Sequence, residues 1–268
     1  MSEAFKIGWF SSGRGEGSRD LLRTAWRSIA EGEIKAEIAF VFSNRERGQA
    51  EGSDAFFDLV NSYNIPLINV SSRKYRDRFG EQWRPKFEDE AMAKLKPFQP
   101  DLCVLAGYML IAGAEMSQRY PMLNLHPAAP GGPKGTWPEV IWQLIAEDAA
   151  ETGVMMHRAT PVLDEGPPVT YCTYSIRGAP FDRHWEALKG RSVDQVRAEE
   201  GEDNPLFKQI RRHGLTREFP LIITTIKAFS EGRVRIEGQG VVDRDGNPIE
   251  AYDLTEEIDE KVKGVLAE

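Results

Sequence analysis

The sequence is poor in the residues that most often bind zinc. Its 268 residues include two cysteines, Cys103 and Cys172, and four histidines. Both cysteines sit in apolar or alternating runs, which is typical of buried thiols in strands. No spacing of cysteine and histidine resembles a zinc site. We therefore expect a functional site that works without a metal.

Long hydrophobic runs and an excess of positive charge are missing as well. No apolar run approaches the length of a membrane-spanning helix, and the start, Met-Ser-Glu-Ala, lacks the pattern of a signal peptide. The net charge of -8 argues against a nucleic-acid groove. We expect a cytoplasmic protein, a monomer or homodimer, that acts on small molecules and binds neither nucleic acid nor membrane.

What is present indicates an α/β fold. The chain is 41% hydrophobic and 28% charged, as in ordinary globular proteins. Amphipathic helical segments alternate with short apolar runs, which predicts a mostly parallel, twisted sheet flanked by helices. In such sheets ligands bind beyond the carboxyl ends of the strands. Three segments that follow predicted strands could therefore line one cleft: 11–18, 106–112 and 124–126.

Two of the polar residues at a predicted strand end suit acyl transfer. In Met122-Leu123-Asn124-Leu125-His126-Pro127, the amide and the imidazole are two residues apart, so they face the same side of a strand. A turn with a carboxylate, Asp164, follows about forty residues later. An amide can stabilise an oxyanion, an imidazole can move protons, and a carboxylate can orient the imidazole.

Other features have two interpretations each. The glycine-rich loop at 11–17 matches neither the dinucleotide fingerprint nor a P-loop. It is either a tight structural turn or a phosphate site built from backbone N–H groups, with Arg14 or Arg19 adding charge. The apolar loop at 106–112 is either core or a grip for a flat heteroaromatic ligand. His157 is either a packed core residue or a neighbour of the functional site.

At these residues the chain resembles the folate-dependent formyltransferases, most closely those that act on glycinamide ribonucleotide. The pairing of Asn-x-His-Pro with a later Asp-x-Gly-Pro is fairly specific, and the resemblance covers most of residues 5–242. It is carried by Ser12-Gly13-x-Gly15, Leu105-Ala106-Gly107-Tyr108-Met109, Asn124-Leu125-His126-Pro127, Thr152-Gly153-Val154-Met155-Met156-His157, Asp164-Glu165-Gly166-Pro167 and Phe219-Pro220-Leu221-Ile222.

The resemblance implies a formyltransferase of Rossmann-type fold. It implies transfer of a formyl group from 10-formyltetrahydrofolate to a primary amine, with glycinamide ribonucleotide of purine biosynthesis as the expected acceptor. Asn124, His126 and Asp164 would be catalytic, with His126 held by Asp164. The substrate phosphate would bind at Ser12, Gly13, Arg14 and Gly15. The folate pocket would comprise Tyr108, Met109, Leu110, Ile111, Ala112, Thr160, Val162 and Leu163.

The same resemblance gives an expected domain organisation. A formyltransferase domain would span 1–242, with a phosphate-binding half at about 1–100 and a folate-binding and catalytic half at about 101–242. Residues 243–268 would form a peripheral C-terminal extension.

Departures from the family pattern concern the acceptor. Leu215-Thr216-Arg217 stands where the family has a glutamate that contacts the substrate ribose, and the segment 177–215 is longer than expected. Arg73 resembles a substrate-side arginine. Three alternatives therefore stay open: a formyltetrahydrofolate hydrolase, a sugar-amine formyltransferase, and a non-catalytic module that binds folate or phosphate.

Overall fold

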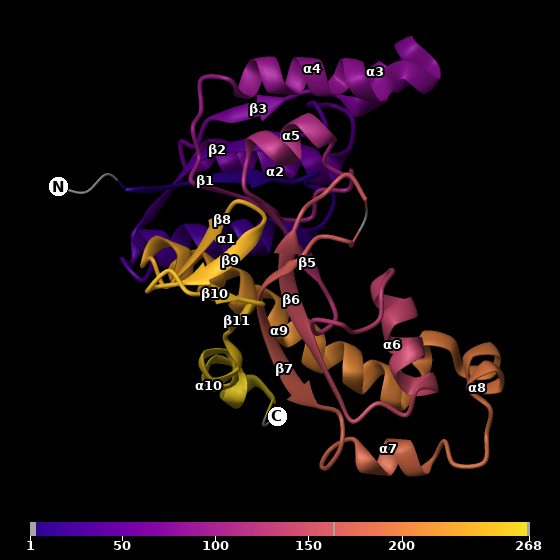
Figure 1. Ribbon diagram of the computed structural model, residues 1–268. Coiled ribbons are helices and arrows are strands. Elements are labelled where there is room, and N and C mark those ends of the chain that lie inside the picture. The colour runs from indigo at the N-terminus through magenta and orange to yellow at the C-terminus, as the bar shows by residue number, and fades with distance from the viewer. Residues whose placement is uncertain (1–3, 163, 267–268) are drawn as a thin grey trace. The chain divides into compact units, whose positions relative to one another are not determined.

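The computed structural model describes residues 4–162 and 164–266, which form two compact units (Figure 1). The first unit holds the chain up to Asn124, together with Arg158–Gly166 and Ile226–Ile236. The second holds Leu125–His157, Pro167–Thr225 and the chain from Glu237 on. Strand β5 (Met122–His126) therefore begins in the first unit and ends in the second.

A parallel sheet forms the centre of the first unit. Its strand order is β5-β4-β1-β2-β3, and each pair of neighbours is parallel. All of β4 and the last four residues of β1 are buried, as continuous apolar strands predict for a sheet covered on both faces. The parallel sheet expected from the sequence is thus confirmed. Its strands are β1 (Phe5–Phe10), β2 (Ala36–Ser43), β3 (Leu67–Asn69) and β4 (Leu102–Leu105).

Helices between these strands cover the sheet. The charged segment 71–96 has apolar residues at helical spacing, yet the structure divides it at Gly80, whose φ of +53° ends the first helix. A short 3-10 turn then leads into the second helix, which lies against β3 (Figure 1). The helices of this unit are α1 (Glu16–Ala30), α2 (Glu51–Ser62), α3 (Ser72–Phe79), α4 (Trp83–Leu95) and α5 (Ala114–Arg119).

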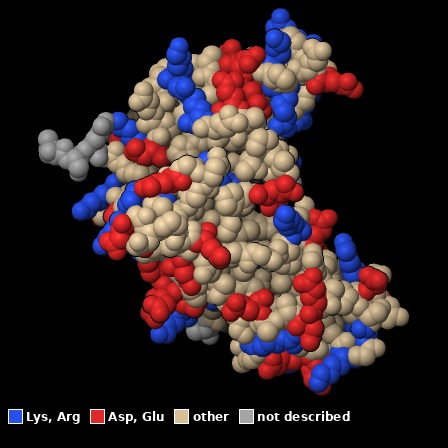
Figure 2. Space-filling model, in the orientation of Figure 1, with Lys and Arg blue, Asp and Glu red and all other residues tan. Residues whose placement is uncertain are grey.

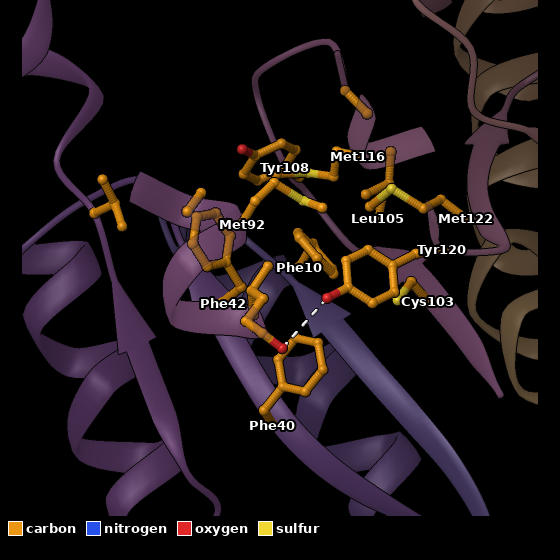
Figure 3. Close-up of a cluster of buried hydrophobic side chains, with 14 of the residues drawn as sticks. Phe10, Phe40, Phe42, Met92, Cys103, Leu105, Tyr108, Met116, Tyr120 and Met122 are labelled. Atoms are coloured by element: carbon orange, nitrogen blue, oxygen red, sulfur yellow. Dashed lines mark hydrogen bonds between the residues drawn. The ribbon is translucent and has the colours of Figure 1, made fainter. Parts of the chain in front are cut away.

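The first unit also contains an aromatic core. The rings of Phe10 and Phe42 have centroids 5.2 Å apart, and Tyr108 lies edge-on to Phe10 at 5.8 Å (Figure 3). The hydroxyl of Tyr120 donates to the backbone oxygen of Leu95 at 3.3 Å, so the polar end of this buried ring is satisfied. The packing joins β1 and β2 to the loop after β4.

The second unit is built on an antiparallel pair of strands, β6 (Glu151–Arg158) and β7 (Pro168–Ser175). The C-terminal segment adds a short strand, β11 (Tyr252–Asp253), parallel to β7, and a helix with Ile258 and Val262 buried. The helices of this unit are α6 (Trp137–Ala146), α7 (Asp182–Glu186), α8 (Val193–Glu200) and α10 (Thr255–Leu266), together with α9 (Pro205–Ser230) as far as Thr225. The strands β9 (Gly240–Asp243) and β10 (Pro248–Ile249) are antiparallel, whereas β8 (Val234–Glu237) belongs to the first unit up to Ile236.

Within the described residues, no helix combines the length and the apolar character that crossing a membrane requires.

The parallel sheet is tightly packed at Gly8, which is in register with Phe40 of β2 and Cys103 of β4. A Cβ at this position would lie 2.6 Å from the Phe40 ring and 2.7 Å from Cys103 Sγ. We expect Gly8→Ala to lower the free energy of unfolding by about 1–3 kcal/mol, because the strands would have to move apart. Urea unfolding followed by circular dichroism measures the change.

The matched control is Gly17→Ala in α1. A Cβ there would meet nothing within 4 Å, and alanine favours the helix. This variant should be neutral or stabilising by up to about 1 kcal/mol. Equal losses in the two variants would contradict the packing explanation for Gly8.

Candidate functional site

The loop after β1 is fixed by a buried serine. Ser12 Oγ donates to Asn44 Oδ1 at 2.6 Å and accepts from the backbone N–H of Met109 at 2.9 Å. Its own N–H donates to the carbonyl of Gly107 at 3.1 Å, and its carbonyl accepts from Ser53 Oγ at 3.1 Å. Every polar group of Ser12 thus bonds inside the protein. The residue joins the loops that follow β1, β2 and β4.

The start of α2 packs tightly against the same loop. Gly13 has φ of +60°, and a Cβ there would lie 2.8 Å from the Phe56 ring. A Cβ on Gly52 would lie 2.2 Å from the carbonyl oxygen of Arg14. The N–H of Gly13 donates to Ser11 Oγ at 3.1 Å. Of the four residues predicted to bind phosphate, Ser12 and Gly13 are buried, whereas Arg14 and Gly15 are exposed directly before α1.

The loop after β4, predicted to bind folate, faces two directions. Tyr108 and Ala112 are buried in the aromatic core, and burial raises the pKa of the Tyr108 phenol. The side chain of Met109 is 61% exposed, and Leu110 and Ile111 are half-buried. Tyr108 and Ala112 therefore anchor the loop in the core, and the middle of the loop is accessible to solvent.

A pocket of about 400 Å³ lies beside the end of this loop. Pro161 also lines it, from the turn that the resemblance assigns to the same folate pocket as the loop. The Glu88 carboxylate packs directly on Gly113, where a Cβ would overlap it, and burial raises the pKa of this carboxyl. Arg84 donates to the carbonyl of Ile111 at 2.9 Å, so α4 fixes the loop.

The turn at 160–164 contributes the other predicted folate residues. Thr160 Oγ1 donates to the carbonyl of Val162 at 2.7 Å, and Val162 is 53% exposed. Asp164 is half-buried with φ of +53°, a conformation that favours glycine and is tolerated by aspartate. Leu163 lies outside the described residues. The first unit thus contains the predicted loop, the predicted turn and the carboxylate.

The imidazole of His126 is held by its own following loop. The side chain is 2% exposed, and Nε2 lies 2.9 Å from the carbonyl oxygen of Pro133. Because a carbonyl oxygen only accepts, Nε2 carries the proton in this hydrogen bond. The buried ring of His157 on β6 lies perpendicular to it, with centroids 6.1 Å apart. This hydrogen bond fixes the orientation of the imidazole ring.

Asn124 is half-buried on β5, opposite Leu105 of β4. It belongs to the first unit together with Asp164, whereas His126 and His157 belong to the second. As predicted, Asn124 and His126 lie two residues apart on one strand. The joint action of Asn124, His126 and Asp164 stays a prediction.

The residues at which the resemblance would place a ribose-contacting glutamate, Leu215 to Arg217, lie on α9. Leu215 on α9 is 46% exposed. Arg217 is buried, donates to Asp259 Oδ1 of α10 at 2.9 Å, and lies over the ring of Tyr174 at 4.4 Å. Arg217 thus anchors the C-terminal helix.

Comparison with known families places the chain in a class. The family model described as formyl transferase matches residues 6–179. The chain therefore belongs to the formyl transferase family, as the sequence resemblance predicts.

Two curated relatives are called phosphoribosylglycinamide formyltransferase. The protein from Schizosaccharomyces pombe is 27% identical over 166 residues, which cover 59% of this chain and 76% of that protein. The one from Saccharomyces cerevisiae is 32% identical over 93 residues, or 32% of this chain and 44% of that protein.

Solved structures support the fold. A phosphoribosylglycinamide formyltransferase from Coxiella burnetii, in complex with CHES, matches with a TM-score of 0.64 at 22% identity, covering 94% of this chain and 99% of that one. A formyltetrahydrofolate deformylase from Pseudomonas syringae matches with a TM-score of 0.61 at 18% identity, covering 90% and 66%. At these identities the matches establish the fold alone.

Replacing Ser12 tests its bridging role. Ser12→Ala leaves the buried Asn44 Oδ1 and the Met109 N–H without this partner, so we expect the free energy of unfolding to fall by about 1–3 kcal/mol. Ser62→Ala at the exposed end of α2 removes one surface hydroxyl bond and should change it by less than about 0.5 kcal/mol. Urea denaturation of both variants provides the comparison, and a Ser12→Ala loss no larger than that of the control would contradict the role.

Proposed function

We propose that the protein transfers a formyl group from 10-formyltetrahydrofolate to a primary amine, with glycinamide ribonucleotide as the favoured acceptor in purine biosynthesis. The observation that carries the proposal is the family match over residues 6–179, which includes Asn124, His126 and Asp164. The names of the two curated relatives support the acceptor.

The proposed reaction needs an oxyanion stabiliser and a proton carrier. The amine nitrogen attacks the formyl carbon, a carbon–nitrogen bond forms, and the formyl oxygen gains negative charge. Breakdown of this intermediate breaks the bond to N10 of the folate. The amine nitrogen loses a proton and N10 gains one, so the reaction balances without a redox partner. A protein can therefore accelerate this reaction by positioning the amine against the formyl carbon and by stabilising the charge on the formyl oxygen.

Three side chains are assigned to these tasks. The amide of Asn124 donates to the formyl oxygen as it becomes negative. His126, whose ring is oriented by the hydrogen bond between Nε2 and the Pro133 carbonyl, carries the proton from the amine towards N10. The Asp164 carboxylate stabilises the positive charge that the imidazole then carries. The protein supplies the electrostatic stabilisation, and the folate carries the one-carbon unit.

The donor is assigned to the loop after β4 and the turn at 160–164. Met109, Leu110, Ile111 and Val162 offer accessible apolar surface, whereas Tyr108 and Ala112 support the loop from the core. On the acceptor side, Arg14 is exposed beside Gly15, the N-cap residue of α1. A guanidinium and the first N–H groups of a helix together attract a phosphate.

Alanine variants of the two strand residues test the catalytic assignment. Asn124→Ala and His126→Ala should each lower turnover by about 10²-fold or more, while binding of the folate largely survives. The matched controls are Asn61→Ala and His184→Ala, which remove the same side chains from α2 and α7. Single-turnover kinetics and fluorescence titration with folate separate chemistry from binding. Turnover at the control level in both variants would refute the assignment.

An acceptor screen tests the reaction itself. Loss of the formyl group from 10-formyltetrahydrofolate is followed with glycinamide ribonucleotide, with amino sugars and with water alone. We expect consumption that depends on glycinamide ribonucleotide and is stoichiometric with the formylated product. Equal consumption with water alone would identify a hydrolase, and no consumption with any acceptor would favour a binding module.

A further inference from the structure

The pocket at the end of the loop after β4 is rich in carboxylates. It has a volume of about 400 Å³, within the usual range for small-molecule sites, and its lining belongs to the first unit. Among the described residues, three acids line it against one basic side chain, Arg84; the acids are Glu88 and Asp89 on α4 and Glu115 on α5. Figure 2 shows acidic residues gathered over α4, whereas lysines and arginines are gathered over α3.

Glu88 differs from the other two acids because it is largely buried. Its side chain is 16% exposed and its carboxylate packs on Gly113, whereas Asp89 and Glu115 are exposed. Within the described parts of the chain, this carboxylate accepts no hydrogen bond. Nη1 of Arg84 lies 3.8 Å from Oε1 of Glu88, which is beyond hydrogen-bond distance, and donates instead to the carbonyl of Ile111 at 2.9 Å. Both oxygens of Glu88 are therefore available to a ligand.

This environment disfavours the ionised form of Glu88. Burial raises the pKa of the carboxyl, and the neighbouring Glu115 and Asp89 raise it further, whereas Arg84 opposes the shift. A carboxylate that is withdrawn from water without hydrogen-bond donors is unfavourable. A ligand that brings N–H donors to this carboxylate would supply the missing hydrogen bonds and stabilise its charge.

The rest of the pocket wall is mostly apolar. Ile111 and Ala112 come from the loop after β4, Pro161 comes from the turn at 160–164, and Pro85 comes from α4. The loop and the turn are the two segments to which the donor is assigned. Apolar side chains together with one carboxylate that lacks donors suit a flat heteroaromatic ring with N–H groups on its edge.

We propose that Glu88 determines donor specificity by accepting hydrogen bonds from the N3–H and the 2-amino group of the folate ring. The inference rests on the proposed function, which assigns the donor to this loop and this turn, and it adds a side chain from α4 to the donor site. The two N–H donors of the ring are adjacent and lie in one plane, as those of a guanidinium group do. They therefore match the two oxygens of a single carboxylate.

Two stable analogues of the donor test the proposal on the full chain by isothermal titration. One is 10-formyl-5,8-dideazafolate, which keeps the 2-amino group, and the other carries a methyl group in its place. The unmodified protein should bind the 2-amino compound at least about tenfold more tightly, because the methyl compound leaves one oxygen of Glu88 without a donor. Glu88→Gln should reduce this preference to less than about threefold, mainly by weakening the 2-amino compound, because the glutamine amide group cannot accept from the 2-amino group.

Glu90→Gln and Glu115→Gln are the matched controls. Glu90 is on the same helix, pairs with Lys94 at 3.5 Å and lies outside the lining of the pocket, whereas Glu115 lines the pocket and is exposed. Both variants should keep the preference of the unmodified protein. A loss in Glu115→Gln as large as that in Glu88→Gln would assign the effect to the overall charge of the pocket and overturn the proposal.

Failure of this inference can be distinguished from failure of the proposed function. Equal binding of the two analogues by the unmodified protein, or a full preference retained in Glu88→Gln, would overturn the role of Glu88 and leave the donor assignment intact. Binding of neither analogue would refute the donor assignment itself. Thermal midpoints verify folding. The comparison of the two analogues on the unmodified protein needs no variant, so it decides the question even if Glu88→Gln does not fold.

Discussion

The hydroxyl of Ser12 is the contact on which the loops at the carboxyl end of the parallel sheet depend. It follows β1, its acceptor Asn44 follows β2, and its donor Met109 follows β4. One buried oxygen therefore ties together the loops at the carboxyl ends of three parallel strands. This is where an α/β sheet presents its binding surface, so the geometry of that surface is set by a residue that is itself inaccessible.

The sequence predicts this arrangement only in part, and the reason is physical. Apolar runs predict the parallel strands, because a strand that is buried on both faces of a sheet needs a continuous apolar run. They also give the positions of two of these loops, at 11–18 and 106–112, which follow β1 and β4. Which loop residues point inward depends on packing between distant segments. Tyr108 turns into the core because Phe10 and Phe42 offer an apolar surface, and no local pattern predicts that.

Long-range pairing also explains what sequence reasoning missed elsewhere. The short strand β11 exists because its residues pair with β7, some eighty residues earlier in the chain. Asn44 directly follows an apolar strand, and that signal could have marked it as a site residue. Glu88 gives no such signal, because an acidic residue in a charged helix usually faces solvent. Only the fold brings it to a pocket that Ile111 and Pro161 also line.

The absence of a carboxylate at Leu215 has a consequence for the proposed acceptor in energetic terms. A carboxylate that accepts hydrogen bonds from sugar hydroxyls provides orientation and rejects analogues that lack them. The matching position here is an exposed leucine, Leu215, which can do neither. Guanidinium groups bind phosphate strongly but are insensitive to the sugar between the phosphate and the amine. A site that has guanidinium groups in place of such a carboxylate binds negative charge more strongly and discriminates less between sugars. The proposed formyl transfer itself does not use that carboxylate, because its tasks are assigned to Asn124, His126 and Asp164.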